Sequence, residues 1–160
     1  MPNAIRWDLD SVNNFALTLG GLASSTSGVG RQSALIDNDT NWWPAAKVYV
    51  QIRVGTTPTA NTAIDVYLIQ SSDDVTSPVR SDNAGTGDAS ITILNSRLLG
   101  TLFVNATTSD VNYYGVFDTW AHGPLGAQWG IAVVHNTAVN LFSAETGHLK
   151  QYRYYNPEVQ

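Results

Sequence analysis

The sequence predicts an all-β protein, an antiparallel β-sandwich. Residues 47–54 alternate strictly, with Val48, Val50, Ile52 and Val54 between polar or amphipathic neighbours, which is typical of a strand with one wet face. Almost no apolar segment reaches helical length, and turn formers such as Gly20-Gly21 separate the segments. Many short strands spaced in this way indicate two packed sheets, with either immunoglobulin-like or jelly-roll connectivity.

The expected strands follow one another along most of the chain. Residues 64–69 repeat the alternation of 47–54, so the two segments are expected to pair antiparallel. Residues 71–90 are polar and carry few large apolar side chains, which predicts a long surface loop. Residues 1–14 are interpreted as an extended N-terminal arm of a single domain covering 1–160. The remaining strands are expected at 4–9, 15–19, 32–36, 91–94, 99–104, 113–119, 129–135, 139–142 and 148–155.

Composition excludes several classes of function. The chain has 160 residues, enough for one domain with a sizeable core, and no cysteine, so disulfides and thiolate metal sites are ruled out. A net charge of -5 argues against nucleic acid, which requires clustered lysine and arginine. No apolar run has the length of a membrane span or a signal sequence, so no membrane partner and no secretion are expected.

Catalytic and metal-binding patterns are not found in the sequence. His122, His135 and His148 lack the short spacing of a metal site, and His135 is interpreted as a structural histidine. Acid pairs such as Asp82 with Asp88 are interpreted as turn caps rather than calcium ligands. There is no G-x-S-x-G elbow and no phosphate loop. We therefore expect a protein that is not an enzyme, with no catalytic residues, no metal and no cofactor.

Aromatic residues are the remaining signal for function. Trp129 is in step with Ile131 and Val133 and is expected in the core. Trp42 and Trp43 are adjacent, and on an extended backbone their indoles would point to opposite faces. One of them is then left for either the 71–90 loop or another molecule to cover. The predicted interface residues are Trp42, Trp43, Trp7, Tyr113, Tyr114, Tyr154 and Tyr155.

The chain also resembles a group of small structural proteins of tailed bacteriophages. The resemblance lies in VGTTPTANTAIDVYL (54–68), RSDNAGTGDASIT (80–92), WGIAVVHNTAVNL (129–141) and GHLKQYRYY (147–155). It extends more weakly through residues 22–41. The NWWPAAK stretch (41–47) departs from it, because less bulky residues are expected there in relatives.

The resemblance implies a virion component assembled in the host cytoplasm. The expected role is that of a capsid decoration or cement protein, a jelly-roll-like sandwich that binds the major capsid protein and stabilises the head. Such proteins are often trimers, so a homotrimer is the favoured oligomer. The alternative is a carbohydrate-binding module or a structural subunit of the tail or fibre, with Trp42, Tyr113, Tyr114 or Trp120 stacking on a glycan.

Overall fold

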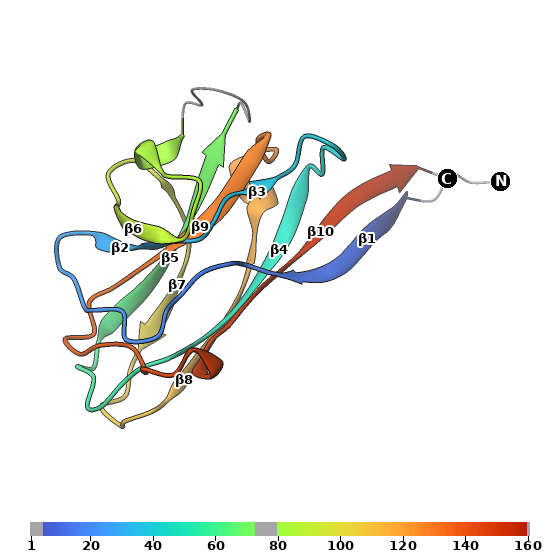
Figure 1. Ribbon diagram of the computed structural model, residues 1–160. Helices are drawn as coiled ribbons and strands as arrows, with labels where there is room; N and C mark the ends of the chain where they lie inside the picture. The colour runs from blue at the N-terminus through green and yellow to red at the C-terminus, as the bar shows by residue number, and fades with distance from the viewer. Residues whose placement is uncertain (1–4, 73–79, 160) are drawn as a thin grey trace.

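The computed structural model describes residues 5–72 and 80–159, which form ten strands in two antiparallel sheets packed against each other (Figure 1). The predicted β-sandwich is confirmed. Three single-turn 3-10 helices lie in the connections: η1 (Ser81–Asn83), η2 (Thr119–His122) and η3 (Glu145–Gly147). The strands are β1 (Ile5–Asn14), β2 (Val29–Gln32), β3 (Ile36–Asp37), β4 (Ala45–Arg53), β5 (Thr62–Ser71), β6 (Ala89–Thr92), β7 (Arg97–Val104), β8 (Asn112–Asp118), β9 (Gln128–His135) and β10 (Leu149–Val159).

The chain crosses several times between the two sheets. The β4 sheet has the order β1-β10-β4-β8, and the β9 sheet has the order β6-β2-β9-β5-β7, with β3 also paired to β9. The expected antiparallel pairing of residues 47–54 with 64–69 is therefore wrong, because β4 and β5 belong to different sheets. Their apolar faces meet across the core instead, and the connection between them is long enough to span the roughly 10 Å between packed sheets.

Alternation along the strands decides which side chains enter the core. The burial pattern of β4 alternates after its first residue, with Val48, Val50 and Ile52 inside. Trp129 is fully buried, so its predicted core position is confirmed. The other strands contribute in the same way. The buried residues of this core include Ile64, Val66, Leu68, Leu102, Val104, Ile131, Val133, Tyr152 and Tyr154.

A second, smaller core lies on the outer side of the β9 sheet. There Ile69 and Ala132 pack with Ala84 and with Ile91 of the edge strand β6, so the chain around Ala84, between η1 and β6, covers part of this face. Gln32 holds the covering segment: its Nε2 donates to the carbonyls of residues 85 and 87, at 2.7 and 2.9 Å. The described residues 80–88 of the predicted surface loop at 71–90 are exposed or half-buried apart from Ala84, and they form no strand, only the short η1 turn, so the loop does lie on the surface; it is anchored by Gln32 and by the buried Ala84. Residues 73–79 lie outside the described residues.

The expected N-terminal arm is also part of a sheet. Residues 5–14 form β1, which pairs antiparallel with β10 and has a bulge between Leu9 and Val12. The first residue of β4 that pairs with β10 is Ala45, opposite Tyr155. The paired ends of β1 and β10 therefore run beyond the start of β4, and Figure 1 shows them as a ribbon leaving the body of the sandwich. Residues 1–4 lie outside the described part.

Two expected strands are irregular segments instead. Residues 15–19 leave β1 without joining a ladder, although Phe15, Leu17 and Leu19 alternate into the core as predicted. In residues 139–142 the pairing reduces to an isolated bridge between Val54 and Leu141. Apolar alternation was a correct indicator of burial in both segments, but it did not indicate whether a neighbouring strand was present.

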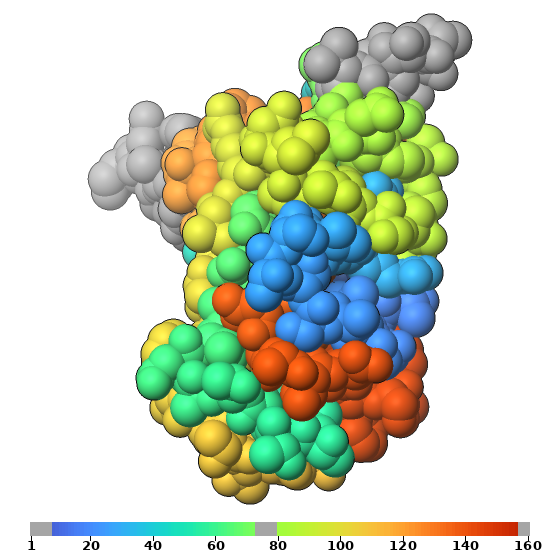
Figure 2. Space-filling model, turned by 90° about the vertical axis from the view of Figure 1, so that its left-hand side faces the viewer, coloured from blue at the N-terminus to red at the C-terminus, as the bar shows by residue number. Residues whose placement is uncertain are grey.

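One end of the sandwich is closed by loops that bond to one another. Figure 2 looks onto this end, where residues 22–30 (blue), 55–61 (green) and 136–146 (red-orange) pack together. Backbone hydrogen bonds join them, including Leu141 N–H to the Leu22 carbonyl (2.9 Å) and Gly55 N–H to the Asn140 carbonyl (3.1 Å). Because Gly55 lies beyond the end of β4 and Trp42 precedes its start, the tryptophan pair sits at the opposite end.

Candidate interaction site

Trp42 and Trp43 separate at a turn rather than along a strand. Trp42 has a φ of 49°, in the left-handed region, and its N–H donates to the Asn38 carbonyl (3.0 Å). The expected extended geometry is therefore wrong at Trp42, because the chain turns there before β4 begins at Ala45. The side chain of Trp42 is 61% exposed, whereas Trp43 is half-buried.

Trp43 belongs to an aromatic cluster that continues into the core. Its indole stacks on the ring of Tyr154, with centroids 5.7 Å apart and planes 10° apart. The Tyr154 hydroxyl in turn accepts a hydrogen bond of 2.8 Å from Trp129 Nε1. Burial raises the pKa of Tyr154 far above its ordinary value. Trp43 is thus covered by its own chain, and the 71–90 segment is not needed for this.

Asn38 holds the tryptophan turn rigidly in place. Its buried side chain bonds both backbone groups of Trp43: Oδ1 accepts from the N–H (3.0 Å) and Nδ2 donates to the carbonyl (3.0 Å). Nδ2 also donates to the Gly126 carbonyl (3.2 Å). The turn is therefore tied to the η2–β9 connection, and Trp42 is presented from an ordered backbone.

A second exposed indole lies at this end of the sandwich. Trp120, in η2, is 51% exposed, and its N–H donates to Asp118 Oδ1 (3.0 Å), which caps the turn. The N–H of Ala46 donates to Thr119 Oγ1 (2.8 Å), so η2 is joined to the start of β4. Trp42 lies in the turn before β4 and Trp120 lies in η2, and hydrogen bonds hold both segments at the end of the sandwich where β4 begins.

Asp118 organises the surface beside Trp120. It pairs with Lys47 Nζ (2.5 Å) and accepts a 2.5 Å hydrogen bond from the Tyr155 hydroxyl. Burial alone would raise the pKa of Asp118, but the bonds from Lys47, Tyr155 and the Trp120 N–H outweigh it and hold that pKa below its ordinary value. Tyr155 is buried in this arrangement.

A different exposed apolar group occupies the outer face of the β4 sheet. Tyr114 and Val116 in β8 are 69% and 64% exposed and lie opposite Gln51 and Tyr49. Leu149 in β10, also opposite Gln51, is exposed as well. Sequence reasoning missed Val116 and Leu149, although the alternation in residues 113–117 was a signal that could have placed Val116 on the face of Tyr114.

The structure separates the seven predicted interface residues. Trp42 and Tyr114 are exposed, but they lie near opposite ends of β4, about six residues or roughly 20 Å apart. Tyr113 turns inward and packs against the core. Tyr154 and Tyr155 are buried, so their assignment to an interface is corrected: the chain itself covers both rings.

The other two predicted residues have different positions. Trp43 is half-buried against Tyr154, as described above. Trp7 lies in β1 opposite Pro157 of β10, and its side chain is outside the described part of the structure. Among the predicted interface residues whose side chains are described, Trp42 is therefore the exposed one at the end of the sandwich opposite the bonded loops.

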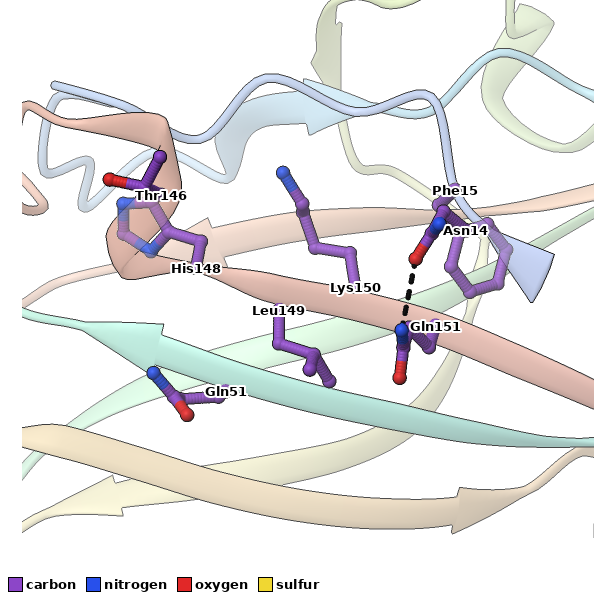
Figure 3. Close-up of a pocket in the computed structure, with 8 residues that line it drawn as sticks. All are labelled: Asn14, Phe15, Gln51, Thr146, His148, Leu149, Lys150 and Gln151. Atoms are coloured by element: carbon purple, nitrogen blue, oxygen red, sulfur yellow. Dashed lines mark hydrogen bonds between the residues drawn. The ribbon is translucent and has the colours of Figure 1, made fainter. Parts of the chain in front are cut away.

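A depression at the junction of β1 and β10 has most of its polar side chains paired within the protein. It has a volume of about 400 Å³ and is shown in Figure 3. Gln151 Nε2 donates to Asn14 Oδ1 (3.1 Å), and Lys150 bonds Glu145 and the Leu17 carbonyl. His148 Nδ1 accepts from the Arg53 N–H, and its Nε2 donates to the Phe142 carbonyl. These bonds connect segments of the fold, so we regard this depression as structural.

Several other titratable residues are also committed to the fold. Nε2 of His135 lies 3.0 Å from the Leu22 carbonyl and Nδ1 lies 3.0 Å from Thr137 Oγ1, which confirms a structural histidine. Burial lowers its pKa. The Asp82 carboxylate accepts hydrogen bonds from the N–H groups of residues 94–96, and the Asp88 carboxylate binds Arg31 and Thr18. Within residues 5–72 and 80–159, three or more metal-ligating side chains do not gather at one point. The helical turns in this part of the chain have neither the length nor the apolar composition of a membrane span.

Comparison with known proteins adds no assignment: no family model, no curated protein and no solved structure matches this chain.

Proposed function

We propose that this chain is a structural protein of a tailed-bacteriophage virion, a capsid decoration protein that binds the major capsid protein and stabilises the head lattice. The resemblance in residues 54–68, 80–92, 129–141 and 147–155 supports a phage origin. The strand order supports jelly-roll connectivity, because β1-β10-β4-β8 faces a sheet that contains β2-β9-β5-β7. Jelly rolls are frequent in viral capsid proteins and in lectins.

The exposed indole of Trp42 is the observation that carries the proposal. A tryptophan that is 61% exposed on a turn held by the buried Asn38 is in place for a partner before binding. Large aromatic side chains dominate the energy of many interfaces, and a rigid backbone reduces the entropy lost on binding. We assign the contact with the major capsid protein to this end of the sandwich.

Stabilisation of the head then follows from mass action. A protein that binds the assembled lattice but not the free subunits shifts the equilibrium toward the assembled state. Each contact needs only a standard interface of about 1,600 Å², since repetition over the lattice adds avidity. The outer face of the β4 sheet, with Tyr114 and Val116, is the surface we assign to contacts between copies in a trimer.

A subunit of the tail or fibre that binds glycans is the alternative. Exposed Trp120 and Tyr114 suit ring stacking on a sugar, whereas Tyr113 does not because it packs inward. Imaging of particles separates the alternatives. Copies over the whole shell support decoration, and copies confined to the tail support the alternative.

The test of the interface compares two exposed apolar side chains. Trp42→Ala is expected to lower the occupancy of purified particles at least tenfold, while Leu94→Ala, at an exposed position between β6 and β7, leaves occupancy unchanged. Circular dichroism checks that both variants are folded. Single replacement of Trp42 is sharper than replacing both indoles, because Trp43 also packs against the core. Normal occupancy of the Trp42→Ala variant would overturn the assignment.

A further inference from the structure

A depression of about 510 Å³ lies beside η2, between the end of β5 and the start of β7. Its size falls within the range of small-molecule sites, roughly 300–1,000 Å³. Its lining combines polar side chains with a small apolar surface from a leucine, a glycine and a proline. The lining residues are Leu68, Gln70, Ser81, Asn95, Arg97, His122, Gly123 and Pro124.

The polar groups here differ from those at the depression of Figure 3, because several donors have no acceptor. Gln70 uses its Oε1 to accept from the Gly126 N–H (3.1 Å), and Asn95 uses its Oδ1 to accept from the Asp82 N–H (3.1 Å). Over the described part of the chain, the Nε2 of Gln70, the Nδ2 of Asn95 and the ring nitrogens of His122 make no hydrogen bond within the protein. These donors are left for a ligand.

Arg97 supplies a positive charge at the same place. Its Nη1 donates to the His122 carbonyl, which fixes the guanidinium against η2. Among the described residues Nε and Nη2 have no partner, so they are available for a carboxylate. None of the lining residues in the described part of the chain is acidic, although the chain as a whole has a net charge of -5. The nearby Asp82 directs its carboxylate to the N–H groups of residues 94–96. The depression is therefore rich in donors and locally positive.

We propose that this depression binds one acidic sugar unit, of the uronic acid class, through Arg97, Gln70, Asn95 and His122. The carboxylate of the sugar pairs with Arg97, since a guanidinium binds carboxylates in a planar, two-bond geometry. Its hydroxyl groups accept from the free amide and imidazole donors, and the apolar lining contacts its C–H groups.

A single arginine suits one carboxylate better than a polyphosphate or a nucleic acid, which require several cations. Trp120 belongs to the same single turn as His122 and is exposed, so it is available for a neighbouring sugar ring. The proposal does not rest on the phage assignment or on Trp42.

Titration of the purified protein with D-glucuronate, followed by amide chemical shifts in NMR, tests the site. We expect saturable shifts at residues 95–97 and 120–123, and binding at least tenfold weaker for methyl glucoside, which lacks the carboxylate. Arg97→Gln is expected to weaken glucuronate binding at least tenfold and His122→Ala to weaken it less. Arg31→Gln serves as the control. Arg31 lies on β2 and pairs with Asp88, and its replacement is expected to leave glucuronate binding unchanged.

Three results would overturn the proposal. The first is the absence of shifts at tens of millimolar glucuronate. The second is equal binding by the Arg97→Gln variant while its spectrum remains that of the folded protein. The third is an equal response to acetate, which would mean that the depression takes any small anion and does not recognise the sugar. Trp42→Ala retains glucuronate binding if the two sites are independent, so failure of one proposal is distinguishable from failure of the other.

Discussion

The indole of Trp43 lies parallel to the ring of Tyr154, at a centroid separation of 5.7 Å, while the adjacent Trp42 is 61% exposed. Two residues with the same side chain therefore have opposite environments. The difference comes from the turn at Trp42 and from Asn38, which fixes the backbone of Trp43 against the sandwich. Trp43 contributes to the stability of the fold, and Trp42 is available for contact with another molecule.

This difference predicts unequal effects on stability. Trp43→Ala is expected to lower the free energy of unfolding by about 2–3 kcal/mol, because it removes the stack on Tyr154 and leaves a cavity beside the core. Trp42→Ala is expected to change it by less than about 0.5 kcal/mol, as is usual for exposed sites. Urea unfolding of both variants measures the two values. Equal losses would contradict the assigned environments.

The second prediction concerns the close approach of β7 and β8 around Phe117. A Cβ atom on Gly115 would lie 2.6 Å from both Leu102 Cδ2 and Phe117 Cζ. Gly115→Ala is therefore expected to lower the free energy of unfolding by about 1–3 kcal/mol through overpacking. Gly87→Ala is the matched control, because nothing lies within 4 Å of its added Cβ, and its effect should stay within about 0.5 kcal/mol. A Gly115→Ala protein as stable as the control would show that the sheets separate easily there.

The third prediction concerns acid. Glu145 pairs with Lys150 and accepts the N–H groups of Leu19 (2.9 Å) and Gly20 (2.7 Å), which joins residues 19–20 to the segment before β10. Burial opposes ionisation, but these bonds outweigh it and lower the pKa of Glu145 below its ordinary value of 4.5. The stabilisation is therefore fully present above about pH 4.5 and is lost as the pH falls through the lower pKa of the folded state.

Glu145→Gln should accordingly be less stable than the unchanged protein at neutral pH, with the difference shrinking as the solution is acidified below pH 4.5. Thermal unfolding over a series of pH values measures this. Asp8→Asn, at an exposed acid of β1, provides the control. A difference that stays constant down to pH 3 would contradict a role for the Glu145 charge.

Much of the fold could be predicted because period-two alternation reports burial directly. It located β4, β5, β7 and β9 to within a few residues, and it placed Phe15, Leu17 and Leu19 in the core even where no strand forms. Alternation does not report which strand lies beside which. The expected pairing of β4 with β5 was wrong for that reason, since an apolar face can be buried equally well by a facing sheet.

The candidate site was less predictable. That Trp42 and Trp43 could not share one environment followed from their adjacency, but the reason is a left-handed turn that the sequence did not reveal. Tyr155 was expected at an interface and is buried instead, because Lys47 and Asp118 of two other strands meet its side chain. The donors around Arg97 come from β5, the β6–β7 connection and η2, and β5 and η2 are distant from Arg97 in sequence.

The sequence by itself determined the class of fold, most of the aliphatic residues of the main core and the lack of cysteine chemistry, because composition and local periodicity are properties of single segments. Tertiary structure alone decided the sheet partners, the closing of one end by bonded loops, the burial of Tyr154 and Tyr155, and the gathering of free donors beside η2. Each of these depends on contacts between segments far apart in the chain, and the pattern within one segment carries no information about which distant segment will meet it.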